Sequence, residues 1–94
     1  MYARQGYEPL KETHEAAKIG FILTELDLAL TFCRVAESAD DEGKAKRNKA
    51  HARKAYDSAI HFLASATLTP QIKQEISDKI ERLRLLLAGL GEAL

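Results

Sequence analysis

The 94-residue sequence contains one cysteine, two prolines, no tryptophan and equal numbers of acidic and basic side chains. The lone cysteine, Cys33, excludes an internal disulfide and favours a reducing compartment. The near absence of proline, with many Ala, Leu, Lys, Glu and Arg residues, is typical of an all-helical chain. A formal net charge of zero provides no overall field to attract nucleic acid or an anionic membrane. A chain of this length is expected to form one domain with one core.

The sequence also lacks the segments that mark secreted, membrane-spanning and metal-binding proteins. The N-terminus MYARQGYEP has no apolar signal core, and no run approaches the roughly 18 apolar residues of a membrane span. We therefore expect a cytoplasmic protein without a membrane span. The spacings of His14, His51 and His61 match no metal motif such as HExxH. We accordingly expect no cofactor, no metal site and no enzymatic activity.

Helical periodicity indicates three helices, at about residues 9–38, 41–66 and 70–88, within a domain covering residues 9–91. Residues 1–8 show no period and are expected to form a flexible N-terminal arm. Pro9 fits the first turn of a helix, and Thr69 with Pro70 is a typical N-cap and first helical position. Short connections between the helices predict an all-α antiparallel three-helix bundle, up-down-up, with a long first helix.

The first helix has an unusually wide apolar circumference. One seam with spacings of three and four residues comprises Ile19, Ile22, Leu26, Ala29, Cys33 and Ala36. A second seam comprises Leu10, His14, Ala17, Phe21, Leu28 and Val35, with Phe32 beside it and Thr24 and Thr31 at its weaker steps. A surface helix usually buries a stripe little more than about 100° wide, and this helix offers roughly twice that. We therefore expect it to have at least two neighbours.

Four polar residues are candidates for burial in the bundle. Glu25 lies between the two seams, and antiparallel packing places it level with Arg53 and Tyr56, its expected partners. Glu25 is interpreted either as a carboxylate that fixes the register of the first two helices or as one that binds a ligand or acts in catalysis. Asn48 is expected to bond to the backbone or to Arg34, or else to serve in recognition.

The second expected helix combines small residues with a basic segment. Its apolar face is rich in alanine, which allows a close approach to the first helix, and comprises Ala45, Ala52, Ala55, Tyr56, Ala59, Ile60, Phe62, Leu63 and Ala66. Residues 44–54, KAKRNKAHARK, could form a patch for phosphate or nucleic acid. Only Lys46, Lys49 and Arg53 share a stripe, so a solvated helix face is the competing interpretation. On the third helix, Glu75 and Lys79 are spaced to pair within one turn.

Residues 55–90 resemble the last two helices of a microtubule interacting and transport (MIT) domain. The shared features are Tyr56 with a small residue three positions later, the aromatic-Leu pair of Phe62 and Leu63, a short turn, and then Ile76 and Lys79-Ile80 before a leucine-rich end. The same Ala and Tyr spacing is similar to a tetratricopeptide helix. The resemblance implies an antiparallel three-helix module that binds an amphipathic helix or strand of a partner in a groove between helices.

We interpret the chain as a non-enzymatic protein-interaction module. The surplus apolar face of the first helix serves as a homodimer interface, as a groove for an amphipathic helix of another protein, or as part of a generous core. The alternative is a small basic adaptor that binds nucleic acid or phosphate through residues 44–54, which we rank lower. Leu85 lies opposite the apolar stripe of the third helix. The candidate contact residues are Phe21, Leu28, Phe32, Val35, His14 and Leu85.

Overall fold

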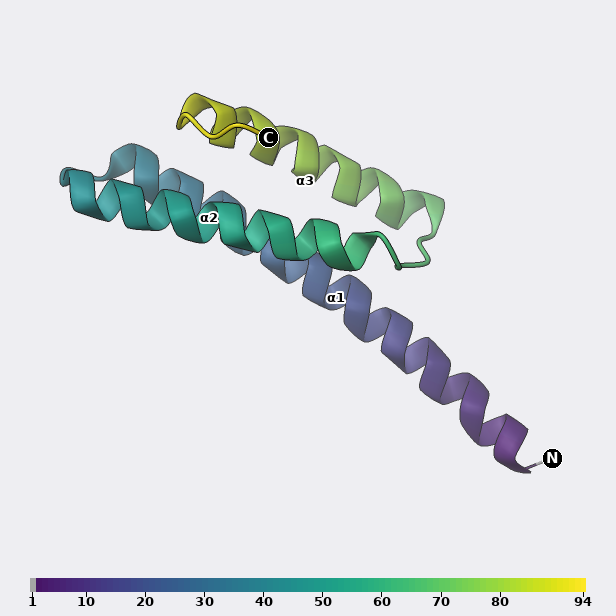
Figure 1. The fold of residues 1–94 in the computed structure, drawn as a ribbon. Helices are drawn as coiled ribbons and strands as arrows, with labels where there is room; N and C mark the ends of the chain where they lie inside the picture. Colours follow the sequence, from purple (N-terminus) through teal and green to yellow (C-terminus); the bar gives the residue numbers. More distant parts are fainter. Residues whose placement is uncertain (1) are drawn as a thin grey trace.

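The computed structural model describes residues 2–94, with side chains described from His14 onward. The chain forms three helices, α1 (Tyr2–Ser38), α2 (Glu42–Leu63) and α3 (Pro70–Gly89). Helix α2 runs back along α1, and α3 returns in the same general direction as α1 (Figure 1). The predicted all-α three-helix bundle with a long first helix is confirmed, because α1 packs against both α2 and α3.

The helix ends are set by local hydrogen bonds that the sequence signals. Asp41 caps α2, with its Oδ1 accepting a hydrogen bond from the Gly43 amide at 2.8 Å. Thr69 caps α3 in the same way, and Pro70 occupies the first turn. At the C-terminal end of α3, Gly91 has a φ of 91°, and the Glu92 amide donates to the carbonyl of Leu87 at 3.0 Å. Glycine tolerates this left-handed conformation, so α3 ends where expected.

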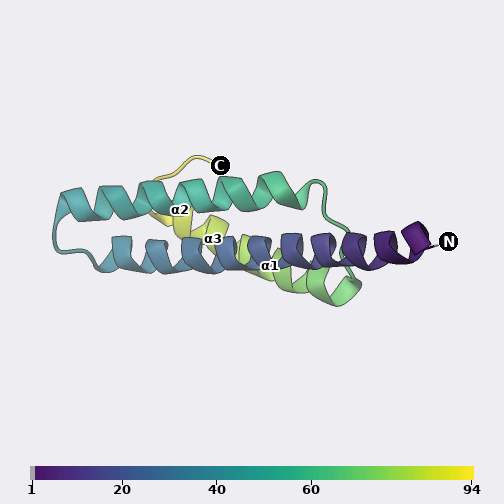
Figure 2. The same cartoon turned by 90° about the horizontal axis from the view of Figure 1, so that it is seen from below.

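Helix α1 begins at Tyr2, so the expected start at Pro9 is wrong. Residues 2–8, which were expected to form a flexible arm, continue the helix, and Met1 lies outside the described residues. Adding residues to an existing helix avoids the cost of a new nucleus, which is the physical reason that a weak pattern can still be helical. The N-terminal part of α1 extends past α2 and α3 (Figure 2), and the longest dimension of the protein is 61 Å.

The first seam of α1 forms the centre of the core. Ile22, Leu26 and Cys33 are fully buried against the fully buried Ala52 and Ala59 of α2. Helix α3 contributes large side chains to the same cluster, namely Ile76, Leu83 and Leu87. The contact between α1 and α2 is therefore made through small side chains of α2. The contact of α3 with the other two helices is made through large side chains of α3. Within residues 2–94, no helix is long and apolar enough to cross a membrane.

The buried face of α2 is narrower than its apolar pattern. Ala52, Ala55 and Ala59 are buried, but Ile60 and Phe62 are 37% and 39% exposed. The physical reason is that α2 contacts α3 much less than it contacts α1. Large side chains at the edges of the alanine face therefore remain accessible to solvent.

Polar contacts tie α1 to the rest of the bundle at two levels. Lys79 of α3 donates a hydrogen bond to Asp27 Oδ1 at 2.7 Å, so Lys79 forms its ion pair with α1. The prediction that Lys79 pairs with Glu75 is wrong. Near the turn between α2 and α3, Glu15 Oε2 accepts from the Thr67 amide at 3.2 Å, and Lys18 Nζ donates to the Ser65 carbonyl at 3.2 Å. These contacts fix the level at which α1 leaves the bundle.

Candidate functional site

The second seam of α1 is exposed along the outside of the bundle. Phe21 is 42% exposed and Leu28 is 43% exposed, while Phe32 and Val35 are half-buried. We call these four residues the outer stripe. Leu28 lies about 200° around the helix from the fully buried Leu26, at about 100° per residue. Asp27, which contacts α3, lies about 100° from Leu28. The outer stripe therefore faces away from α3, and its Phe32 also packs against the core.

Two ring contacts join the outer stripe to α2. Phe21 meets Phe62 edge to face, with ring centroids 5.0 Å apart, and Phe32 lies 5.2 Å from the ring of His51. The exposed apolar surface thus continues from α1 onto Phe62, which is 39% exposed. Sequence reasoning did not assign a site role to Phe62 or His51. Their spacing of eleven residues, about three helical turns, places Phe62 and His51 on the same side of α2. That spacing is the sequence pattern that could have identified them as a pair.

Histidines lie at the margins of this surface. His14, the N-terminal candidate of the second seam, is exposed. The His61 ring is 5.1 Å from Phe62 in an edge-to-face arrangement. No group of three or more metal-ligating side chains occurs within the described part of the chain. The side chains that this surface presents are mainly aromatic and apolar.

The prediction that four polar side chains are buried is wrong. Glu25, Arg53, Tyr56 and Asn48 are all half-buried, and no polar or charged side chain among the described residues is buried. Long polar side chains can lie along apolar surface while their ends reach water, which removes the need for an internal partner. No ion pair joins Glu25 to Arg53 among the described contacts. Asn48 donates to the Lys44 carbonyl at 2.9 Å, so its expected bond to the backbone is confirmed.

Arg53 bonds instead within α2 and to the C-terminal segment. Its Nε donates to Asp57 Oδ1 at 3.1 Å, and its Nη1 donates to the Ala93 carbonyl at 2.6 Å. The Glu92 carboxylate lies 4.0 Å from the same Nη1. The sequence pattern does not predict these partners of Arg53, because two of them lie in the segment that turns back after α3. It places two carboxylates beside a cation that was expected to bind an anion.

The three cations of the candidate anion patch are therefore divided. Lys46 and Lys49 line a hollow of about 390 Å³ together with Glu42, Ala45 and Leu90. Arg53 lies in a different hollow, with Asp57 and Glu92. The acidic neighbours reduce the positive potential that an anion would meet at Arg53. Anion binding by residues 44–54 stays a prediction, with Lys46 and Lys49 as its remaining adjacent pair.

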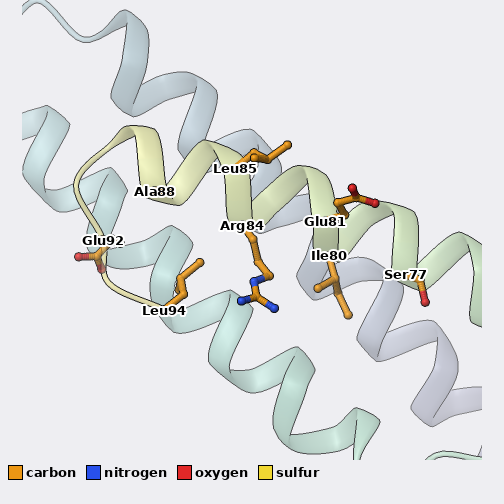
Figure 3. A pocket seen from close by; sticks show the side chains of 8 residues that line it. All are labelled: Ser77, Ile80, Glu81, Arg84, Leu85, Ala88, Glu92 and Leu94. Atoms are coloured by element: carbon orange, nitrogen blue, oxygen red, sulfur yellow. The ribbon is translucent and has the colours of Figure 1, made fainter.

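A second apolar surface lies on α3. A groove of about 620 Å³ is lined by Ser77, Ile80, Glu81, Arg84, Leu85, Ala88, Glu92 and Leu94 (Figure 3). Leu85 is 71% exposed, which agrees with its predicted place opposite the apolar stripe of α3. Leu94 comes from the chain after α3 and lies beside the Arg84 side chain, while Leu85 points to the other side of α3. The C-terminal segment thus forms part of this groove.

Cys33 is the strongest potential nucleophile among the described residues, and its surroundings suppress its reactivity. The side chain is fully buried in the core. Burial raises the pKa of the Cys33 thiol from 9.0 to about 11, and the negative charge of Glu37 adds to the rise. Because the thiolate is the reactive form, this environment keeps Cys33 inert at neutral pH.

Comparison of the chain with known protein families, with curated proteins and with solved structures finds no match.

Proposed function

We propose that this protein is a non-enzymatic interaction module that self-associates through the outer stripe of α1. The observation that carries the proposal is the exposure of Phe21 and Leu28, at 42% and 43%, in line with the half-buried Phe32 and Val35. Single exposed apolar residues are normal on soluble proteins, but an aligned apolar patch marks a surface for binding. The contact between Phe21 and Phe62 widens this patch across two helices.

The chemistry of the described residues favours binding over covalent catalysis. The Cys33 thiol is buried with a raised pKa. The carboxylate of Glu25 lies at the edge of the outer stripe without a described base, nucleophile or second carboxylate bonded to it. Aromatic side chains such as Phe21, Phe32 and Phe62, by contrast, are of the kind that is enriched in protein interfaces.

Self-association is the most economical use of this surface, because a symmetric dimer covers the same patch on both copies. Leu28→Lys places a charge in the middle of the outer stripe, where a partner would exclude water. We expect this variant to be monomeric at concentrations at which the unmodified chain is dimeric, as measured by light scattering after size-exclusion chromatography. Circular dichroism should show the same helix content, because Leu28 is outside the core.

Leu85→Lys is the matched control. It makes the same chemical change at a residue that is 71% exposed, but on the α3 groove. We expect this variant to dimerise as the unmodified chain does. A chain that stays monomeric into the high micromolar range contradicts self-association. Dimerisation that is lost with Leu85→Lys and kept with Leu28→Lys assigns the interface to the α3 groove instead.

A further inference from the structure

The N-terminal part of the α1 backbone projects past the other two helices of its own chain (Figures 1 and 2). The last described contacts toward the N-terminus are made by Glu15 and Lys18 with the turn after α2. Beyond them α1 continues to Tyr2, past the ends of α2 and α3 (Figures 1 and 2). We call residues 2–14 the overhang, which is about 20 Å long at 1.5 Å per residue. Because most helical stability in proteins comes from packing of an apolar face, a packing partner would stabilise this part of α1.

The overhang has the length that the outer stripe requires. From Phe21 to Val35 the stripe also measures about 21 Å. We infer that a second copy of the chain binds antiparallel, with the overhang of each α1 lying along the outer stripe of the other. This inference rests on the proposed self-association and specifies its geometry. It gives a closed, two-fold symmetric dimer in which each overhang gains a neighbour.

The sequence register of α1 fits this antiparallel pairing. If the two-fold axis crosses α1 at the level of Ile19, residue n of one copy lies level with residue 38 − n of the other. Position 10, a leucine, then falls opposite Leu28, and Ala17 falls opposite Phe21. His14 falls opposite Thr24, so a polar position meets a polar one. The spacing of three and four residues along the second seam is the spacing by which two helices pack continuously.

The charges at the edge of the stripe favour the antiparallel arrangement over a parallel one. Glu25 flanks the stripe, and the described contacts include no ion pair for its carboxylate. In the antiparallel pair, position 11, a lysine, comes within one helical turn of the level of Glu25. A parallel pair in register places Glu25 level with Glu25 of the second copy, and like charges repel.

The size of the contact predicts a moderate affinity. Two α1 helices in contact from residue 3 to residue 35 cover about 48 Å of length and about 10 Å of width, or roughly 480 Å² on each copy. A standard interface covers about 800 Å² on each partner. We therefore expect a dimer that dissociates on dilution into the micromolar range.

Distances between spin labels on the two copies test the arrangement. Gly20→Cys and Arg34→Cys are each made in a Cys33→Ala background and labelled with a nitroxide, and the distances are measured by double electron-electron resonance. Both sites tolerate a label, because a Cβ at Gly20 has open space around it and Arg34 is exposed. The antiparallel pair separates the two labels along the axis by about 3 Å at position 20 and by about 45 Å at position 34.

The outcomes separate this inference from the proposed function. A short distance at position 20 with a long one at position 34 supports the antiparallel dimer. Short distances at both positions mean a parallel dimer and overturn the arrangement while self-association stands. Long distances at both positions place the interface elsewhere. A monomer overturns both.

Two further measurements keep the test decisive. If Cys33→Ala impairs folding, the labels can be placed in the presence of Cys33, whose buried thiol with a raised pKa does not react at neutral pH. Leu10→Lys places a charge in the overhang, and a circular dichroism spectrum with unchanged helix content shows that the variant remains folded. We expect it to raise the dissociation constant of the dimer at least about tenfold, because the lysine would bury an unpaired charge against the apolar stripe of the second copy. An unchanged constant removes the overhang from the interface.

Discussion

Replacing a buried alanine of α2 with leucine tests whether small residues set the distance between α1 and α2. Ala59 is fully buried within the cluster that contains Leu26 and Leu30 of α1. If space were available, the added carbon atoms would stabilise the fold by about 2 kcal/mol, at about 0.8 kcal/mol per buried methylene. If the helices are in contact through alanine, the larger side chain forces them apart at a cost of about 1–3 kcal/mol. The change in the free energy of unfolding therefore has opposite signs in the two cases.

We expect Ala59→Leu to lower the free energy of unfolding by about 2 kcal/mol, because Ala52, Ala55 and Ala59 are all buried along this contact. For a domain of this size, that change lowers Tm by roughly 10 °C. Urea denaturation followed by circular dichroism measures it. Ala50→Leu is the control, since Ala50 is exposed on the same helix and its replacement should change stability by less than about 0.5 kcal/mol. An Ala59→Leu variant as stable as the unmodified chain would refute close packing through alanine.

Two further predictions concern ionisable groups. The Cys33 thiol has its pKa raised from 9.0 to about 11 in the folded protein, so the neutral thiol stabilises the fold fully below pH 9 and this contribution is lost between pH 9 and 11. The unmodified chain should therefore lose stability more steeply than Cys33→Ala across that range in urea titrations, and equal slopes contradict the raised pKa. The ion pair between Lys79 and Asp27, at 2.7 Å, joins partly exposed side chains, so a double-mutant cycle with Asp27→Asn and Lys79→Gln should give a coupling of about 0.2–1 kcal/mol that salt reduces. A coupling that persists in molar salt contradicts this electrostatic origin.

Local signals in the sequence predicted the helix boundaries that depend on neighbouring residues. Thr69 with Pro70 was sufficient to place the start of α3, because an N-cap is a local property of the sequence. The start of α1 at Tyr2 was not predictable in this way. Residues 2–8 have neither a period nor a cap, and their helicity continues from a helix that is already formed.

The candidate surface was partly predictable for the same reason. Periodicity identified two seams on α1 and placed Phe21 and Leu28 on the second, and the structure leaves both residues exposed. Periodicity could not identify Phe62 and His51 as their neighbours, because contacts between helices depend on how two axes cross. It also gave Arg53 the wrong partner, since the chain after α3 returns to bond with it.

The sequence by itself determined that this chain is helical, where two of its three helices begin, and that α1 has more apolar circumference than one neighbour covers. These properties follow from residue types at fixed spacings along one helix. Only the tertiary structure decided which seam of α1 became core, because α2 and α3 could have packed against either one. Burial of Ile22, Leu26 and Cys33 removed the first seam from water, and the same packing left the second seam as surface.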